Sequence, residues 1–194
     1  MNKPKIILIG GGGHCKSCID VIELQDNFKI EGIIDLPEKK GQKILGYPII
    51  GSDNDLEDLS KLYSYFFITL GQIKDYSKRK MLFDKLVLME VQIPVIISPL
   101  AYVSKHSKIG MGSIIMHYAI VNADAIIGKN CIINTRSIIE HDSSIGDHCH
   151  ISTGAILNGG VKVGNNTFIG SGAVSKEYIE IAQNSFIKAN TIVK

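Results

Sequence analysis

The chain has 194 residues, of which 45% are hydrophobic, and its 21 basic and 19 acidic side chains leave a formal net charge of +2. This length can bury the core of one domain or of two small ones. The basic and the acidic residues are both spread along the chain, and no basic block stands out, which argues against nucleic acid as a partner.

The first apolar run lies within "MNKPKIILIG" at the start of the chain and is too short for a signal peptide. No later stretch approaches the roughly 18 apolar residues of a membrane span. The four cysteines are therefore expected to be reduced thiols. We expect a cytoplasmic protein with no membrane span.

The N-terminal half alternates predicted strands and helices. In chain order these are a buried strand "KIILIG" (5–10), a glycine loop "GGGH" (11–14), a helix "CKSCIDVIELQ" (15–25), a strand "FKIEGIIDL" (28–36), a strand "YSYFFITLG" (63–71) and a helix "DYSKRKMLFDKLVLME" (75–90). Strand, glycine loop, helix and strand in this order predict an α/β, Rossmann-like βαβ domain. We expect it to span residues 1–93.

The glycine loop resembles a dinucleotide-binding fingerprint but does not complete it. Lys16 stands where that fingerprint has its third glycine. A bare backbone at the start of a helix still favours phosphate, and Asp35 at the end of the second strand can bind a ribose or a base. The loop therefore indicates a nucleotide-sugar site, with a structural turn or a vestigial pocket as alternatives. Cys15 and Cys18 form a C-x-x-C without a second pair and are expected to be small helix residues.

An aliphatic residue recurs every six positions from Ile97 to Val193, and Ser175 is the single interruption. A period of six fits neither a helix nor a simple alternating strand, but it fits short strands separated by corners. Small residues such as Ala119 and Cys131 follow four positions after nearly every aliphatic residue and suit tight corners. Three such strands close a coil of about 18 residues. The repeat therefore predicts that residues 94–194 form a left-handed parallel β-helix of hexapeptide repeats.

Stacking of residues 18 apart places His141 between Ala123 and Gly159, two residues without bulk, with a shallow recess beside the imidazole. Glu140 and Asp142 flank this histidine, and at most one of them is expected to reach it. A carboxylate that does so would fix the imidazole tautomer and raise its basicity, as a general base requires.

The remaining histidines carry weaker signals. His106, His117 and His148 are expected to be solvated surface side chains. His117 falls one coil and one face away from His141, so the two cannot share a metal ion within one chain. Zinc-dependent hydration needs three close imidazoles and is a minor alternative, so no metal is expected. His150 is expected to stack between Ile132 and Phe168.

Several stretches together resemble one family. "GGGGH", "IIDL", "ITLG" and "NTRSIIEHDSSIGDHCHIS", combined with the hexapeptide repeat, are similar to the NeuD-type sugar O-/N-acyltransferases. Within that family they resemble most the bacterial N-acetyltransferases that modify the 4-amino group of a UDP-linked amino-deoxy sugar, as in bacillosamine synthesis. The resemblance implies acetyl-CoA as donor, a nucleotide-linked amino sugar as acceptor, a homotrimer, and active sites between neighbouring β-helices.

The resemblance also implies a role for individual residues. It implies that His141 is the general base and that Asp142 raises its basicity. It places His150 and Gly159 at the acetyl-CoA site and Asn134 near the acceptor amine. The implied nucleotide-sugar set is Gly12, Gly13, His14, Asp35 and Gly71.

The chain departs from the family pattern at two places. Leu36 stands where the family often has a second acid, and "IAQNSFIKANTIVK" (181–194) continues the repeat where the family has a "GVPAK"-like close. The pantetheine tail of CoA is therefore expected to be held differently. Two rival functions remain: O-acetylation of a sialic-acid-type sugar by the same base, and a non-catalytic trimer that binds sugar nucleotides.

Overall fold

The computed structural model describes residues 3–194, and the chain divides into two compact units. The first unit runs to Gly71 and also includes Ser77–Pro94. The second unit consists of Gln72–Tyr76 and Val95–Lys194.

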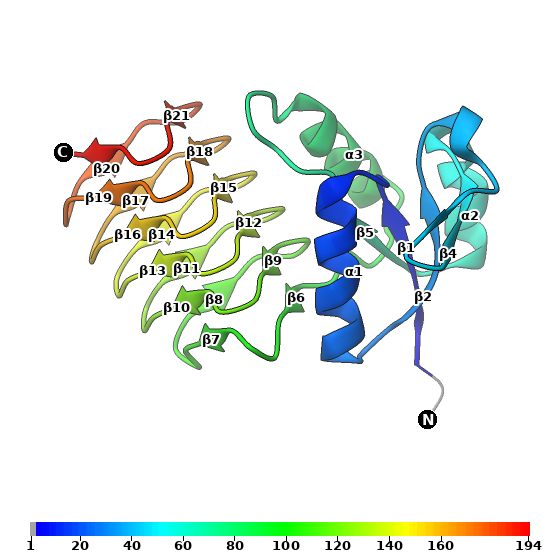
Figure 1. Cartoon of the computed structure of the whole chain (residues 1–194), viewed down its shortest axis with the longest axis horizontal. Helices are drawn as coiled ribbons and strands as arrows, with labels where there is room; N and C mark the ends of the chain where they lie inside the picture. The colour runs from blue at the N-terminus through cyan, green and yellow to red at the C-terminus, as the bar shows by residue number, and fades with distance from the viewer. Residues whose placement is uncertain (1–2) are drawn as a thin grey trace. The chain divides into compact units, whose positions relative to one another are not determined.

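The first unit is built on a five-stranded sheet with the order β3-β4-β2-β1-β5 (Figure 1). Its strands are β1 (Lys5–Ile9), β2 (Lys29–Ile34), β3 (Lys43–Ile44), β4 (Tyr47–Gly51) and β5 (Tyr65–Ile68). Its helices are α1 (Gly13–Gln25), α2 (Leu56–Leu62) and α3 (Ser77–Leu88), with 3-10 turns η1 (Pro37–Lys39) and η2 (Asp53–Asp55). All neighbouring strands are parallel except β3 and β4.

The predicted strands over 5–10, 28–36 and 63–71 and the helices over 15–25 and 75–90 are all present. β1 is buried from Ile6 to Ile9. Ile7 and Ile9 belong to a hydrophobic cluster that also contains side chains of α2 and α3 on one face of the sheet. The buried side chains of α1 lie outside this cluster. β3, β4 and α2 were not predicted, because they are too short for a periodic signal.

The strand order creates a topological switch point between β1 and β5, because the chain leaves β1 toward β2 and later returns on its other side. Ligands bind at such points in open α/β sheets, at the carboxyl ends of the strands. There the hydroxyl of Thr69 donates to the carbonyl of Gly10 at 2.6 Å. The buried guanidinium of Arg79 donates to the carbonyls of Ile68 and Leu70, each at 2.8 Å, and fixes the loop after β5.

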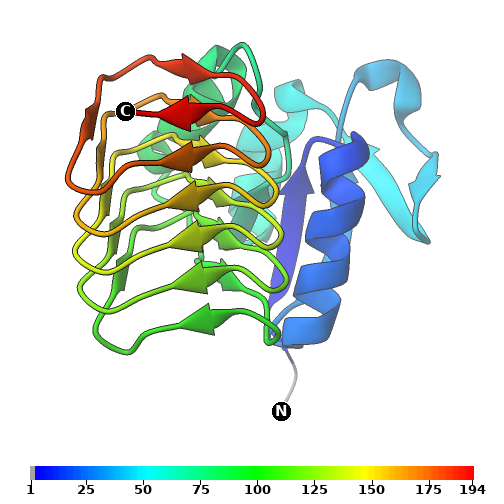
Figure 2. The ribbon, with the colours of Figure 1, turned by 60° about the vertical axis from the view of Figure 1, so that its left-hand side comes forward.

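The second unit is a prism of three parallel sheets with six, five and six strands (Figure 2). Each strand has two residues and pairs with a strand 18 residues away, as in Ile120, Ile138 and Ile156. The strands are β6 (Ile96–Ile97), β7 (Tyr102–Val103), β8 (Lys108–Ile109), β9 (Ile114–Ile115), β10 (Ile120–Val121), β11 (Ile126–Ile127), β12 (Ile132–Ile133), β13 (Ile138–Ile139), β14 (Ser144–Ile145), β15 (His150–Ile151), β16 (Ile156–Leu157), β17 (Lys162–Val163), β18 (Phe168–Ile169), β19 (Val174–Ser175), β20 (Glu180–Ile181), β21 (Phe186–Ile187) and β22 (Ile192–Val193).

The prediction of a left-handed parallel β-helix is confirmed. The second residue of every strand lies on the six-residue phase, and those of the middle coils, such as Ile139 and Leu157, are fully buried in the prism. Ser175 interrupts the aliphatic column without an unsatisfied polar group, because its hydroxyl accepts the N–H of Asn158 at 2.9 Å. Within residues 3–194, no helix has the length and apolar character needed to cross a bilayer.

The outer surface of the prism differs from face to face. On the sheet β22-β19-β16-β13-β10-β7, the first residue of each strand alternates with the buried one and faces outward. We call these outward residues the apolar face; they are Tyr102, Ile120, Ile138, Ile156, Val174 and Ile192. The sheet β20-β17-β14-β11-β8 instead presents mostly charged and polar side chains, including a pair between Lys162 and Glu180 at 2.8 Å.

Candidate active site

The loop after β1 contains glycines of two kinds. Gly10 has a φ of +102°, which favours glycine. A Cβ on Gly11 would lie 2.5 Å from Asp35 Oδ2, so a side chain there would displace this carboxylate. Gly12 and Gly13 face open space, since a Cβ on either would meet no atom within 4 Å. Gly12 is the N-cap of α1, and no side chain caps this helix end within the described residues. The first turn of α1 therefore presents bare backbone to solvent.

Gly71 lies on the other side of the switch point, in the loop after β5. A Cβ on Gly71 would lie 3.5 Å from the Cβ of His14, which is an ordinary van der Waals contact. The structure therefore brings His14 and Gly71, which are far apart in sequence, to the same edge of the sheet. This edge also holds Gly12 and Gly13.

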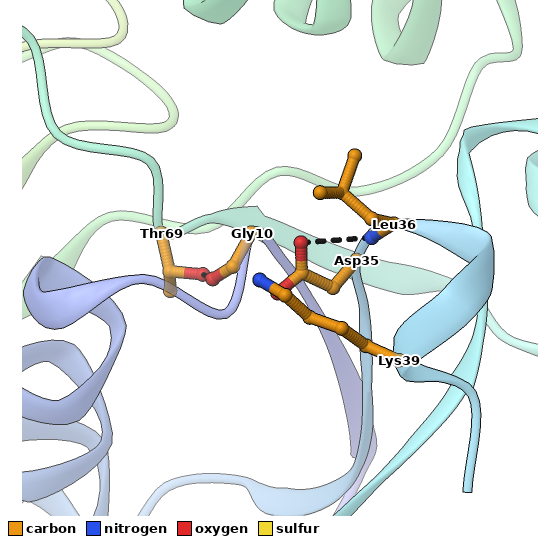
Figure 3. A network of polar contacts seen from close by, with 5 residues as sticks. All are labelled: Gly10, Asp35, Leu36, Lys39 and Thr69. Carbon is orange, nitrogen blue, oxygen red and sulfur yellow. Dashed lines mark hydrogen bonds and ion pairs between the residues drawn. The ribbon is translucent and has the colours of Figure 1, made fainter. Parts of the chain in front are cut away.

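Asp35 lies at the end of β2, and its carboxylate is already engaged on both oxygens (Figure 3). Oδ1 accepts the N–H of Leu36 at 2.8 Å, and Oδ2 accepts from Lys39 Nζ at 3.0 Å. Lys39 is a residue that the sequence analysis missed. Asp35 and Leu36 border a cavity of about 200 Å³, whose wall also includes Gly10, Ser52, Asp53, Asn54 and Lys78.

The two cysteines of α1 are buried and reduced. Burial raises the pKa of both the Cys15 and the Cys18 thiol, which opposes formation of a reactive thiolate. This supports the expectation that they are packing residues of the helix.

His141 lies at the corner that follows β13, and its imidazole is paired with Asp142. Asp142 adopts a left-handed backbone conformation with a φ of 61°, and its Oδ2 lies 2.7 Å from Nδ1 of the ring. Glu140 is turned away and accepts from Asn122 Nδ2 at 2.6 Å. The hydrogen bond that Nδ1–H donates to Asp142, supported by the charges of Asp142 and Glu140, raises the pKa of His141.

Gly159 lies directly against the imidazole of His141, as the 18-residue stacking predicts. A Cβ at this position would be 2.8 Å from Cε1 and 2.9 Å from Nε2 of the ring. The His141 side chain is 56% exposed, so Nε2 is open to a ligand. Gly159 is itself buried, and among residues 3–194 its N–H has no hydrogen-bond acceptor.

His150 stacks between Ile132 and Phe168, as predicted, but its ring is buried. Nδ1 donates to the backbone carbonyl of Gln72, and Nε2 accepts from Asn134 Nδ2 at 3.0 Å. These bonds hold the ring in its neutral Nδ1–H form. In this arrangement neither ring nitrogen is open to a ligand, and Asn134 contacts His150.

The structure corrects the expectation for two other histidines. His148 is only 8% exposed, and its Nδ1 lies 2.9 Å from Asn130 Nδ2. His117 is half-buried, with Nδ1 at 2.7 Å from the hydroxyl of Ser98. The prediction that they are solvated is wrong because corner side chains pack on the neighbouring coil. His106 is exposed, as predicted.

The segment Gln72–Tyr76, which was not predicted to be part of the site, belongs to the second unit and is hydrogen-bonded to the prism. The side-chain amide of Gln72 donates to the carbonyl of His148 at 2.8 Å. The hydroxyl of Tyr76 donates to Asn184 Oδ1 at 3.1 Å. Over the described chain, no group of three histidine, cysteine or acidic side chains is arranged to hold a metal ion.

Family models match both halves of the chain. Residues 5–86 match the PglD N-terminal domain. Residues 106–141 and 142–174 match the bacterial transferase hexapeptide of six repeats, and residues 160–194 match the hexapeptide repeat of succinyl-transferase. No curated protein matches the chain significantly in sequence.

Solved structures match nearly the whole chain. One is a histidine-to-asparagine variant of perosamine N-acetyltransferase from Caulobacter crescentus, solved in complex with CoA and GDP-perosamine. It is 30% identical to this chain with a TM-score of 0.92, and the match covers 98% of this chain and 88% of that chain. The acetyltransferase domain of PglB from Neisseria gonorrhoeae, in complex with acetyl coenzyme A, is 26% identical, with a TM-score of 0.89 and coverages of 99% and 93%. WeeI from Acinetobacter baumannii, at 22% identity, a TM-score of 0.74 and coverages of 97% and 94%, shares the fold.

Proposed function

Because the chain belongs to the NeuD/PglD-type family of sugar N-acetyltransferases, we propose that it acetylates a nucleotide-linked 4-amino-deoxy sugar with acetyl-CoA and His141 as general base. The solved relatives in complex with CoA, acetyl coenzyme A and GDP-perosamine support both substrate classes. The observation that carries the assignment of the base is the pair formed by His141 and Asp142, which leaves Nε2 exposed beside Gly159.

The proposed reaction is a direct transfer. The carboxylate of Asp142 accepts a hydrogen bond from Nδ1–H, so in the neutral ring Nε2 carries the lone pair that a general base needs. The sugar nitrogen attacks the thioester carbonyl carbon, the new N–C bond forms, and Nε2 takes a proton from the nitrogen. The C–S bond then breaks, and the departing CoA sulfur receives a proton from the imidazolium. No covalent enzyme intermediate is required, because the thioester is already activated and both substrates are held together.

Gly159 is the proposed donor to the oxyanion. Its backbone lies against the imidazole of His141, and its N–H has no acceptor within residues 3–194. A backbone donor of this kind contributes about 3–4 kcal/mol to transition-state stabilisation in other enzymes. His150 and Asn134 then support the donor site indirectly, because their polar atoms are bonded to each other and to Gln72.

The first unit is the proposed nucleotide-sugar site. Gly12, Gly13, His14 and Gly71 meet at the switch point, where the free N–H groups of α1 favour phosphate. The base would then lie in the adjoining cavity beside Asp35.

The cavity supports uracil as the base. Guanine offers adjacent N–H donors that a free carboxylate accepts best, yet Asp35 is bonded to Lys39 and Asp53 lies 3.6 Å from Lys78. Uracil offers two carbonyl acceptors, which lysine and amide side chains in this wall can satisfy. Tighter binding of GDP than of UDP in a calorimetric titration would contradict this assignment.

The apolar face supports a homotrimer. Its outer residues form an unbroken apolar column, and the end members Tyr102 and Ile192 are 60% and 70% exposed. Burial of such a column against a second copy removes apolar surface from water. The corner that carries His141 directly follows this sheet. Light scattering should therefore give three times the mass of the chain, and Ile138→Glu should shift it toward the monomer.

The test of the function is to mix the protein and acetyl-CoA with a panel of nucleotide-linked 4-amino sugars and to follow release of the thiol. His141→Ala should lower kcat/KM at least about a hundredfold without unfolding the protein. His106→Ala is the matched control, because His106 is an exposed histidine of the same prism. If His141→Ala has an activity close to that of the wild type, the assignment of His141 as general base is refuted. Transfer to hydroxyl sugars alone would favour O-acetylation, and sugar-nucleotide binding without transfer would favour a non-catalytic trimer.

A further inference from the structure

The β-helix carries unusual residues at four of its corners. Within residues 3–194, the corner position with positive φ is mostly glycine, asparagine or aspartate, which tolerate this conformation best. The exceptions are Tyr118, Arg136, His148 and Tyr178. His148 contacts Asn130 and is buried, and Tyr178 packs on Gly160. Tyr118 and Arg136 are exposed instead, and backbone strain at an exposed side chain is a sign of function.

Tyr118 and Arg136 lie on adjacent coils of one corner, 18 residues apart, and each has a φ of 59°. Tyr118 is 61% exposed. In the described part of the chain, neither side chain has a hydrogen-bond or ion-pair partner. The next two coils have Gly154 and Gly172 at this position, so the fold itself accepts glycine here. We call Tyr118 and Arg136 the tyrosine–arginine pair.

The tyrosine–arginine pair borders the apolar face on the edge opposite to His141. Arg136 precedes β13 and His141 follows it, so the two residues belong to the same coil. Tyr118 precedes β10 in the same way, one coil nearer to the start of the prism. Within one copy, the width of the apolar face therefore separates the pair from the base.

A homotrimer brings these two edges together. When three prisms turn their apolar faces to a threefold axis, the corner before the face in one copy meets the corner after the face in the next. Rotation about this axis changes no height along it, so equivalent coils meet. Arg136 of the partner subunit then lies at the level of His141. Tyr118 of the partner subunit lies one coil, about 4.8 Å, further toward the first coils.

The corner of His141 is acidic and needs a cation from elsewhere to bind an anionic acceptor. Glu140 and Asp142 flank the base, and Asp124 stacks on Asp142 one coil below. These carboxylates repel the diphosphate of a nucleotide-linked sugar, which is one pyranose ring away from the reacting amine.

The opposite corner supplies that cation. In its four middle coils, residues 116–119, 134–137, 152–155 and 170–173, the only permanently charged side chain is that of Arg136. A guanidinium binds a phosphate through two parallel N–H bonds. The exposed ring of Tyr118 has an apolar body and a polar tip, which suits the face of a pyranose and its hydroxyl groups.

We propose that Tyr118 and Arg136 of one copy bind the sugar and the diphosphate of the acceptor at the His141 site of the neighbouring copy, a proposal that rests on the proposed function and its homotrimer. The tyrosine–arginine pair takes no part in proton transfer. Each site then needs side chains of two copies, and a monomer contains no complete site.

The first experiment replaces the pair by asparagine, because Asn190 has a positive φ on the same corner. The double variant Tyr118→Asn/Arg136→Asn should raise the KM of the acceptor about tenfold to a hundredfold, because bonds to a charged group are lost. The KM of acetyl-CoA and the mass of the trimer should not change, and the thermal midpoint should stay the same or rise as strain is relieved. Lys129→Gln is the matched control, an exposed cation on the corner that does not border the apolar face, and should leave both KM values unchanged.

The second experiment uses mixed trimers to show whether the pair acts on the neighbouring copy. His141→Ala and the double variant are coexpressed in equal amounts, and native mass spectrometry establishes that the copies have mixed. A complete site needs a double-variant copy for His141 and a His141→Ala neighbour for the pair. Each occurs with a chance of one half, so about a quarter of the sites should be complete. At low acceptor concentration, the mixture should therefore reach about 25% of the wild-type activity.

Other results would separate the alternatives. If the pair serves the site of its own copy, no site of the mixture is complete, and its activity stays as low as that of its parents. That result, or an unchanged acceptor KM in the double variant, would overturn the inference and leave the acetyltransferase function intact. Dissociation of the double variant into monomers would show that the pair holds the copies together, and would overturn the inference as well. Absence of transfer by the wild type would refute the proposed function, and the inference with it.

Discussion

Substitution of Gly159 by alanine tests the geometry of the base directly. The added methyl group would lie 2.8 Å from Cε1 and 2.9 Å from Nε2 of His141. Ordinary contacts between carbon atoms are about 3.5–4.0 Å, so the ring must move by roughly 0.7–1.2 Å. The ring is exposed at the corner and can move, but its hydrogen bond to Asp142 at 2.7 Å constrains the direction.

The expected effect is a loss of activity without a loss of stability. A displacement of about 1 Å at a reacting group can lower the rate by up to about a hundredfold, so Gly159→Ala should lower kcat/KM by about tenfold to a hundredfold. Gly159 does not have a positive φ, so alanine meets no backbone strain. The free energy of unfolding should stay the same or rise by about 0.4–1 kcal/mol, because alanine restricts the unfolded chain.

The assay measures thiol release at saturating acceptor together with urea unfolding. Gly160→Ala is the matched neighbour: its φ is +70° and its Cβ would lie 2.2 Å from Cδ1 of Tyr178, so it should lose stability. If Gly159→Ala acts only through the ring, it should have little further effect in a His141→Ala background. Wild-type activity of Gly159→Ala, or an equal further loss in that background, would refute the reasoning.

Two further predictions concern pH and packing. His141 accepts a proton only when it is neutral, so activity should fall as the pH drops through its pKa. Asp142 raises that pKa, so Asp142→Asn should move the midpoint of this fall in the pH profile of kcat/KM to lower pH. Glu140→Gln should move the midpoint less, since Glu140 contributes only its charge, and an equal shift would contradict this order. Ile127→Ala should lower the free energy of unfolding by about 2–5 kcal/mol, because Ile127 is 2% exposed inside the prism. Ile126→Ala, at the adjacent position, should lower the free energy of unfolding far less, because Ile126 is 48% exposed. Chemical denaturation measures both values, and equal losses of stability would contradict the assignment of Ile127 to the interior of the prism.

The β-helix could be predicted because its signal is local and repeated. A six-residue period sets the strands, and three strands per coil set a register of 18 residues, which is enough to place His141 against Gly159. The surroundings of His150 carry no such signal. Its partner Gln72 is 78 residues away, in a segment outside the repeat, and only the folded chain shows that the two meet.

The N-terminal unit was predictable to a smaller extent for the same reason. The glycine loop and the strand that ends at Asp35 have local signatures, and both are found at the carboxyl edge of the sheet. Lys39 lies on a three-residue turn that has no periodic pattern, so its bond to Asp35 could not be foreseen. Under the proposed function, its charge is one reason to expect uracil rather than guanine in the adjoining cavity.

The pairing of His141 with Asp142 follows from a rule of the fold that the sequence analysis did not use. A residue with positive φ recurs every six positions along the middle of the β-helix, and Asn130, Asp142 and Asn166 are examples. Aspartate and asparagine tolerate this conformation better than other residues with a side chain. The corner thus favours a short polar side chain on structural grounds, and the same conformation directs the Asp142 carboxylate at the ring one residue earlier. Asp142→Asn should therefore keep the corner and remove only the charge, because asparagine already adopts this conformation at four other corners of the β-helix, Asn130, Asn166, Asn184 and Asn190.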